Sequence, residues 1–162
     1  MAIGTSHGVY KFTRPPDTAT LAMGLIGEIH RRLPDTHLVM HGSSSVPARL
    51  IEAINAAGGS MGPAFGVPVQ EIQQGIRHGV RKINVDTDGR LAITAAVRQA
   101  LAAKPEEFDP RHFTRAGREG MKQIVAERMR QFGQAGHAGD FAPLTLEQMR
   151  DRYRCVADGA AV

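Results

Sequence analysis

Two histidines lie at expected strand ends, which is where the functional residues of an α/β protein usually lie. His7 and His41 each end an apolar run, and each is followed directly by a glycine, Gly8 or Gly42. An imidazole at a strand end can ligate zinc through one ring nitrogen while the other nitrogen donates to an oxygen. The glycines leave backbone groups open to an ion or a phosphate. The pattern predicts a metal and anion site, although histidines with purely structural hydrogen bonds are the alternative.

Polar residues in two further segments extend this predicted site. The hydroxyl-rich loop Ser43–Ser45 leads into an expected helix, an arrangement that favours an oxyanion at the helix N-terminus. The expected strand 80–85 is followed by Asp86 and Thr87, which add a carboxylate and a hydroxyl for substrate. The alternatives are that the serines only cap their helix and that Asp86 and Asp88 only begin the next helix.

Strand-like runs alternate with segments of helical period, which is typical of βα units around a parallel sheet. Strands are expected before His7, over 37–40 and over 80–85. Helices are expected over 18–32, 47–57, 68–76, 90–103, from after Phe108 to about 132, and over 146–153. The first helix should bury Leu21, Leu25 and Ile29, which recur at spacings of four. Because strand ends of a parallel sheet meet at one rim, the predicted site residues should converge there.

Composition narrows the class of protein. With 162 residues, of which 42% are hydrophobic and 22% charged, the chain fits one globular α/β domain. We divide it into 1–107, a partial barrel of three βα units, and 108–162, a helical extension of the same domain. No apolar run is long enough for a membrane span, and the single Cys155 indicates a reducing, cytoplasmic environment. The net charge of +4 is scattered and there is no Trp, which argues against nucleic-acid binding and suits anionic sugar phosphates.

Four motifs together resemble a known family. They are GTSHGVYK at 4–11, HGSSS at 41–45, GVRKINVDTD at 79–88 and FDPR at 108–111. In this order they are similar to class II, zinc-dependent fructose-1,6-bisphosphate aldolases, in a subtype like that of the Calvin cycle. The resemblance runs from Ala2 to about Pro143 and covers only the C-terminal half of that family's chain. It implies that the chain supplies the last three βα units, with C-terminal helices, of a TIM (β/α)8 barrel.

The resemblance also implies roles for individual residues. His7 and His41 match two of three zinc ligands, and Ser6, Gly8 and Gly42 match a monovalent-cation site. The residues matched to substrate contacts are Gly8, Gly42, Ser44, Asn84, Asp86, Thr87 and Arg115. Arg115 would reach the site of a neighbouring subunit, which implies a homodimer or larger homo-oligomer, although an arginine early in a long helix is also typical of a solvated charge. The third histidine and the acid/base carboxylate would lie in the absent half, so no catalytic residue is expected here.

The function implied is aldol cleavage of fructose 1,6-bisphosphate to dihydroxyacetone phosphate and glyceraldehyde 3-phosphate, or their condensation, in glycolysis, gluconeogenesis or the Calvin cycle. Zinc would be the catalytic cofactor and a phosphorylated sugar the substrate. An aldolase acting on tagatose bisphosphate is one alternative, and a truncated fragment without catalysis is another. Whichever of these three interpretations holds, we expect the 162-residue chain to be inactive by itself.

Overall fold

The computed structural model of the chain describes Phe12, residues 15–16 and residues 21–157, and it contains a small parallel sheet with helices packed around it. The elements in chain order are α1 (Met23–Arg32), β1 (Leu38–Met40), α2 (Ala48–Ala56), α3 (Val69–Arg77), β2 (Val80–Ile83), α4 (Thr87–Ala103), α5 (Pro110–Gln131) and α6 (Leu146–Ala157). The mixed α/β class predicted from the alternating pattern is confirmed. The strand expected before His7 lies outside the described residues.

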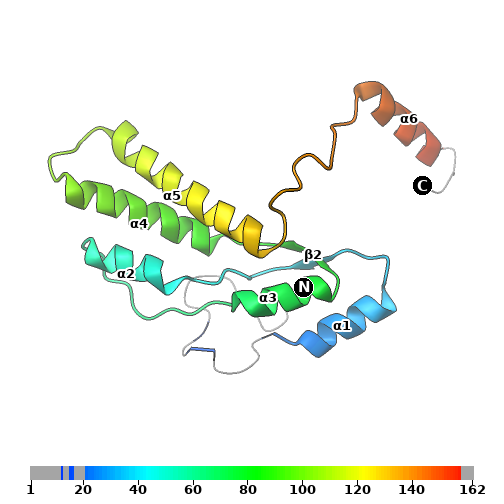
Figure 1. Cartoon of the computed structure of the whole chain (residues 1–162), viewed down its shortest axis with the longest axis horizontal. Helices are drawn as coiled ribbons and strands as arrows, with labels where there is room; N and C mark the ends of the chain where they lie inside the picture. Colours follow the sequence, from blue (N-terminus) through cyan, green and yellow to red (C-terminus); the bar gives the residue numbers. More distant parts are fainter. Residues whose placement is uncertain (1–11, 13–14, 17–20, 158–162) are drawn as a thin grey trace.

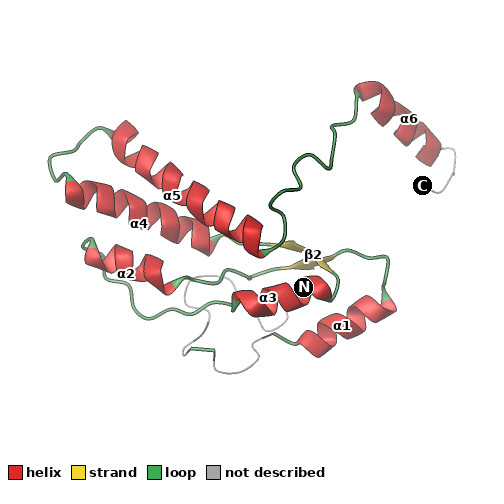
Figure 2. Ribbon diagram, in the orientation of Figure 1, coloured by secondary structure: helices red, strands yellow, loops and turns green. Residues whose placement is uncertain are grey.

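Strands β1 and β2 pair in parallel and form the centre of the fold (Figure 2). Leu38 lies opposite Val80 and Met40 opposite Ile83, with an irregularity in the pairing after Leu38. Parallel neighbours need a long crossover, and here the crossover contains α2 and α3. Both strands therefore run the same way, and their carboxyl ends deliver the loops of the predicted site to one edge.

Two apolar clusters hold these elements. One joins the sheet to α1 and α3 and contains the buried residues Leu21, Ile26, Leu38, Met40, Val67, Ile72 and Val80. The other joins α2 to α4 and contains Val46, Ile51, Ile54, Ala64, Leu91 and Ala95. Val46 belongs to the second cluster although it lies in the loop after β1. The loop of the predicted site is thus anchored in the core.

Helices α4 and α5 form a hairpin beside the sheet, and α6 lies apart from them at the end of an extended segment (Figure 1). The long helix predicted after Phe108 is confirmed as α5. It begins at Pro110, and the carboxylate of Asp109 accepts a hydrogen bond from the Arg111 backbone N–H at 2.9 Å. Proline in the first turn and aspartate at the N-cap are both favourable for a helix start.

The prediction for the first helix is partly wrong. Leu21 and Ala22 precede α1, and the Leu21 backbone N–H donates to the Glu71 carboxylate. Leu25 is 50% exposed, whereas Ile26 is fully buried. The buried face of α1 is therefore shifted by one residue from the face that the predicted spacing indicated.

The boundary between β2 and α4 also differs from the prediction. The strand ends at Ile83 rather than at residue 85, and the helix starts at Thr87 rather than at residue 90. The early start has a tertiary cause, because a serine hydroxyl from another loop satisfies the first N–H groups of the helix.

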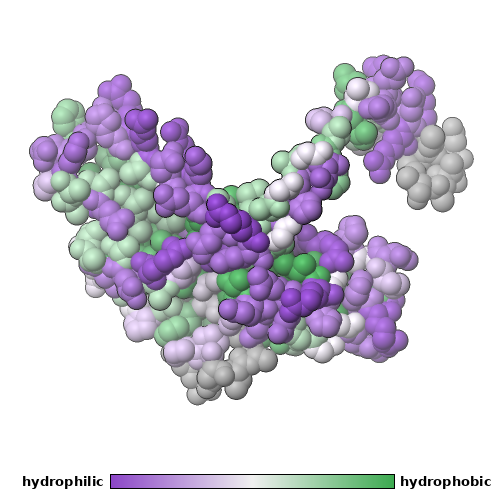
Figure 3. Space-filling view, in the orientation of Figure 1, coloured by the Kyte–Doolittle hydropathy of each residue, from purple (hydrophilic) through white to green (hydrophobic). Residues whose placement is uncertain are grey.

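The surface drawn in Figure 3 carries hydrophobic residues over the α4–α5 region and hydrophilic residues along its outer rims. On α5, the side chains of Met121, Val125 and Met129 are each about two fifths exposed. None of the helices in the described part of the chain is long and apolar enough to cross a membrane.

Candidate functional site

The loop after β1 and the segment after β2 lie side by side beyond the end of the sheet. The Asn84 backbone N–H donates to the Met40 carbonyl at 2.9 Å, and the Ser43 N–H donates to the Asn84 carbonyl at 3.3 Å. These two bonds continue the strand pairing past Met40 and Ile83. The convergence of residues 41–46 with residues 84–88, which was expected from the parallel sheet, is therefore observed.

His41 contacts Asn84 across this junction. The Nδ1 atom of His41 lies 2.8 Å from the amide nitrogen of Asn84, and the Asn84 amide oxygen lies 2.7 Å from the Lys82 ammonium. Since an ammonium can only donate, the Asn84 oxygen accepts from Lys82 and its NH₂ group donates to the histidine. The Nδ1 atom of His41 accepts this hydrogen bond, and the imidazole is exposed at the rim.

Ser44 is buried and closes the N-terminus of α4. Its Oγ atom accepts hydrogen bonds from the Asp86 N–H at 3.2 Å and from the Thr87 N–H at 3.1 Å. The alternative that these serines cap the helix following their own loop is wrong, because Pro47 is the N-cap of α2 and no side chain bonds there. Ser44 instead caps a helix that begins more than forty residues further along the chain.

The conformation of the loop requires two glycines, one within the loop and one in a segment that packs against it. Gly42 has φ +64°, in the left-handed region that side chains other than glycine rarely adopt. Gly66 passes so close to the loop that an added Cβ would lie 2.4 Å from the Ser44 carbonyl oxygen. The neighbouring Val67 N–H donates to that same oxygen at 3.1 Å. The backbone of Ser44 is therefore fixed from one side by the segment 66–67.

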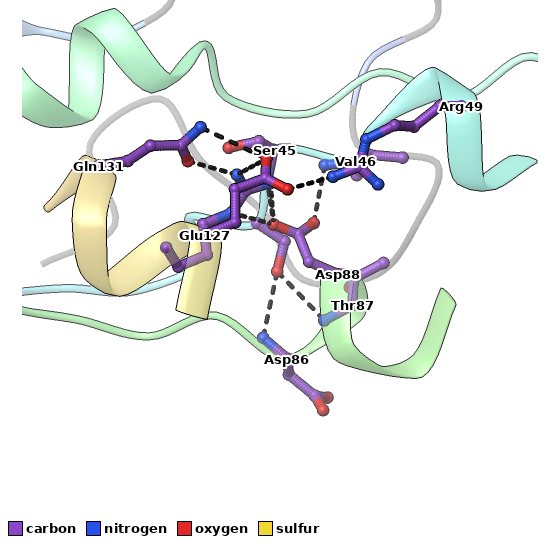
Figure 4. Close-up of polar contacts among 10 residues, drawn as sticks. Ser45, Val46, Arg49, Asp86, Thr87, Asp88, Glu127 and Gln131 are labelled. Carbon is purple, nitrogen blue, oxygen red and sulfur yellow. Dashed lines mark hydrogen bonds and ion pairs between the residues drawn. The ribbon is translucent and has the colours of Figure 1, made fainter. Parts of the chain in front are cut away.

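Asp88 fixes the next two residues of the loop from the other side (Figure 4). Its Oδ2 accepts from the Ser45 N–H at 3.1 Å and its Oδ1 from the Val46 N–H at 2.8 Å. Val46 has φ +51°, which is strained for a β-branched side chain. The fully buried carboxylate compensates for this strain with two hydrogen bonds, and it lies in the first turn of α4, as one of the alternatives predicted.

Arg128 of α5 pairs with Asp88. Its Nε and one terminal nitrogen lie 3.0 and 2.9 Å from Asp88 Oδ2, and the other terminal nitrogen bonds Glu127 and Gln131. Sequence reasoning did not find this residue. A signal did exist, because 117, 124 and 128 are the buried positions of α5, so an arginine stands in the apolar stripe of the helix.

The remaining predicted substrate residues are Asp86, Thr87 and Arg115, and they lie in three different environments. The carboxylate of Asp86 is 74% exposed and pairs with Arg90, while Thr87 is half-buried at the first position of α4. Arg115 is exposed on α5, and Gly117 beside it packs against Val97, in the middle of α4 rather than at its first turn. Within this chain, Arg115 is not brought to the loops.

Ser6, His7 and Gly8 lie outside the described residues, so their predicted roles stay predictions. Among the residues that the structure describes, no group of three or more His, Cys, Asp and Glu side chains is arranged to hold a metal ion. His41 is therefore one candidate ligand, which needs partners from elsewhere.

The family description "Fructose-bisphosphate aldolase class-II" matches residues 1–137. The chain belongs to this family. A fructose-bisphosphate aldolase of Nostoc commune is 60% identical over 153 residues, and one of Pseudomonas aeruginosa is 54% identical over 153 residues. Both alignments cover 94% of this chain but 43% of the relative. The fructose-bisphosphate aldolase 1 of Cereibacter sphaeroides is 51% identical, and its alignment covers 100% of this chain and 45% of the relative. The chain thus spans less than half the length of these relatives.

Proposed function

We propose that this chain forms part of an enzyme that cleaves fructose 1,6-bisphosphate to dihydroxyacetone phosphate and glyceraldehyde 3-phosphate, or condenses them. Family membership gives the reaction class. The observation that carries the proposal is the joint formed by Ser44, at which a small-residue loop meets the N-terminus of a 17-residue helix. Such a joint is suited to the phosphate that both substrate and product carry.

The chemistry of Ser44 supports this assignment. Its oxygen accepts from two backbone N–H groups, so its own hydroxyl hydrogen remains to be donated. The α4 dipole places partial positive charge at the same point. Gly42 and Ser44, together with Gly8, would bind the phosphate of the dihydroxyacetone phosphate portion. Asn84, Asp86 and Thr87 would hold the rest of that triose.

His7 and His41 would be two ligands of a zinc ion. The imidazole of His41 is exposed at the rim and its ring orientation is set by Asn84, and zinc bound at Nδ1 would replace the hydrogen bond from the Asn84 amide. When bound, zinc would polarise the ketone carbonyl of the substrate. The third ligand and the acid/base carboxylate would come from the remainder of the protein. A monovalent cation would be held by carbonyl groups of Ser6, Gly8 and Gly42.

The proposed assembly follows the family resemblance. The parallel strands β1 and β2, with their helices, would be part of a TIM (β/α)8 barrel, and α5 would belong to its C-terminal extension. Arg115 is exposed on α5, as a residue that reaches the site of another subunit must be. We therefore propose a cytoplasmic homodimer or larger homo-oligomer as the working form.

The test is turnover of fructose 1,6-bisphosphate by the full-length protein with zinc, before and after chelation. His41→Ala should abolish metal-dependent turnover and reduce the bound zinc. His37→Ala provides the control, because His37 precedes β1 at its other end and should leave both unchanged. Full activity of the His41→Ala protein would refute the metal assignment, and turnover of tagatose 1,6-bisphosphate in preference would refute the substrate assignment.

A further inference from the structure

Arg128 and Asp88 form a buried ion pair that the proposed reaction does not use. The side chains of Arg128 and Asp88 are 8% and 0% exposed. Taking two charges out of water is costly, and a buried pair is weak evidence for stability alone. This pair connects two distant parts of the chain, because Arg128 lies near the end of α5 and Asp88 in the first turn of α4. The ion pair lies directly behind the loop 44–46, so it can also hold the conformation of that loop.

We propose that Arg128 is a positioning residue for substrate phosphate, which acts through Asp88 to hold the loop 44–46 in its binding conformation. The proposal rests on the proposed function, because it concerns the same loop. It adds that α5, which contributes no residue to the loop, controls how tightly the loop binds phosphate. A polyanionic substrate is the ligand class whose binding should depend on it.

The hydrogen-bond inventory of Asp88 explains why an arginine is needed. Its two oxygens accept from three groups of the protein, the Ser45 N–H, the Val46 N–H and the guanidinium of Arg128. The two backbone bonds orient both carboxylate oxygens toward the loop. The two guanidinium bonds to Oδ2 fix the same carboxylate from behind, and a fork of donors does this better than a single ammonium.

The strained residue makes the loop dependent on this support. Val46 keeps φ +51° while its N–H is bonded to Asp88, so release of that bond favours relaxation toward negative φ. Such a movement would carry Ser45 and Ser44 with it, because they precede Val46 directly in the chain. Ser44 would then lose its bonds to the first turn of α4, where the phosphate is proposed to bind.

Charge gives a second reason. An unpaired carboxylate buried at the N-terminus of α4 would repel a phosphate that approaches the same helix end. Arg128 neutralises this charge at 2.9 Å and still leaves the backbone N–H groups bonded. The arginine itself is covered by Gln131 and Glu127, so it cannot serve as a direct phosphate ligand without leaving the core. This buried placement is the reason that we assign positioning rather than contact.

The experiment compares Arg128→Met with Ile124→Ala in the full-length protein. Methionine keeps an unbranched apolar side chain in place of the arginine stem and removes the donors and the charge. Ile124 is a buried residue one turn earlier in α5 and has no polar group to bond Asp88, so its truncation is the control for lost stability. Both variants should lower the thermal unfolding midpoint. Only Arg128→Met should raise the KM for fructose 1,6-bisphosphate and the Kd for inorganic phosphate, by about tenfold, with a smaller change in kcat.

Amide hydrogen exchange separates this inference from the proposed function. In Arg128→Met, protection at the Ser45 and Val46 amides should be lost, while it should persist in Ile124→Ala. Arg128→Lys should give intermediate protection and an intermediate phosphate Kd, and it carries the test if Arg128→Met does not fold. An unchanged phosphate Kd in both Arg128 variants, with only the unfolding midpoint lowered, would overturn the inference. Absence of fructose 1,6-bisphosphate turnover in the wild-type protein would overturn the proposed function alone, because phosphate binding and exchange are measured without turnover.

Discussion

The hydroxyl of Ser44 accepts a hydrogen bond from the backbone N–H of Thr87 at 3.1 Å, so the loop after β1 caps the helix after β2. A cap of this kind is usually supplied by the residue just before the helix. Here Asp86 occupies that position without any side-chain cap bond. The boundary of α4 and the geometry of the loop therefore depend on each other.

Ser44→Ala should lower stability and weaken phosphate binding together. The loss of an N-cap side chain costs about 1 kcal/mol, and the variant also removes the hydroxyl proposed to donate to phosphate. We expect a lower unfolding midpoint and a higher KM for fructose 1,6-bisphosphate in the full-length protein. Ser60→Ala, in an exposed loop, is the control and should change neither quantity. A normal KM in Ser44→Ala would remove this residue from the phosphate site.

Gly66→Ala should distort the same loop from outside. The added methyl group would lie 2.4 Å from the Ser44 carbonyl oxygen and could be accommodated only by a backbone shift. Overpacking of this kind costs about 1–3 kcal/mol, which chemical denaturation would measure. Gly62→Ala is a matched control four positions earlier, where nothing lies within 4 Å of the added atom. Equal stability of the two variants would show that the loop tolerates displacement.

The general fold could be predicted because its signals are local. Val80, Ile83 and Val85 are β-branched residues in a short segment after Gly79, and Ile51 and Ile54 recur at helical spacing, so β2 and α2 were predictable. The same reasoning failed at Leu25, which is exposed, because the packing of α1 against α3 and the sheet, rather than spacing, selects Ile26 for the core.

The site was predictable only in part, for a related reason. Ser44, Asn84 and His41 are brought together as expected, since parallel strands must end at one rim. The pairing of Asp88 with Arg128 could not be foreseen, because it depends on how α5 packs against α4. An arginine within an apolar stripe indicates a buried partner but does not identify it.

Asp86→Ala should impair substrate handling while zinc is retained. The carboxylate is 74% exposed and its pair with Arg90 is solvated, so its removal should change stability by less than about 1 kcal/mol. We expect a large loss of kcat/KM for fructose 1,6-bisphosphate in the full-length protein, with the zinc content unchanged by elemental analysis. Arg90→Ala breaks the same ion pair but keeps the carboxylate, and it should retain normal kinetics. Parallel losses in both variants would mean that the ion pair, and not the carboxylate, matters.

The start of α5 should loosen in acid. The Arg111 side chain and then its backbone N–H lower the pKa of Asp109, and the Asp109 backbone N–H and then His112 lower the pKa of Glu107. Carboxyl groups with lowered pKa values add stability that is present above their ordinary pKa and is lost as the pH falls through the lowered value. Amide exchange in the first turn of α5 should therefore accelerate between about pH 5 and pH 2, beyond the intrinsic pH dependence of exchange. The double variant Asp109→Asn, Glu107→Gln should remove this pH dependence, whereas Glu106→Gln beside it should preserve it. If the double variant and the wild-type protein lose protection in parallel, these two carboxylates do not control the helix start.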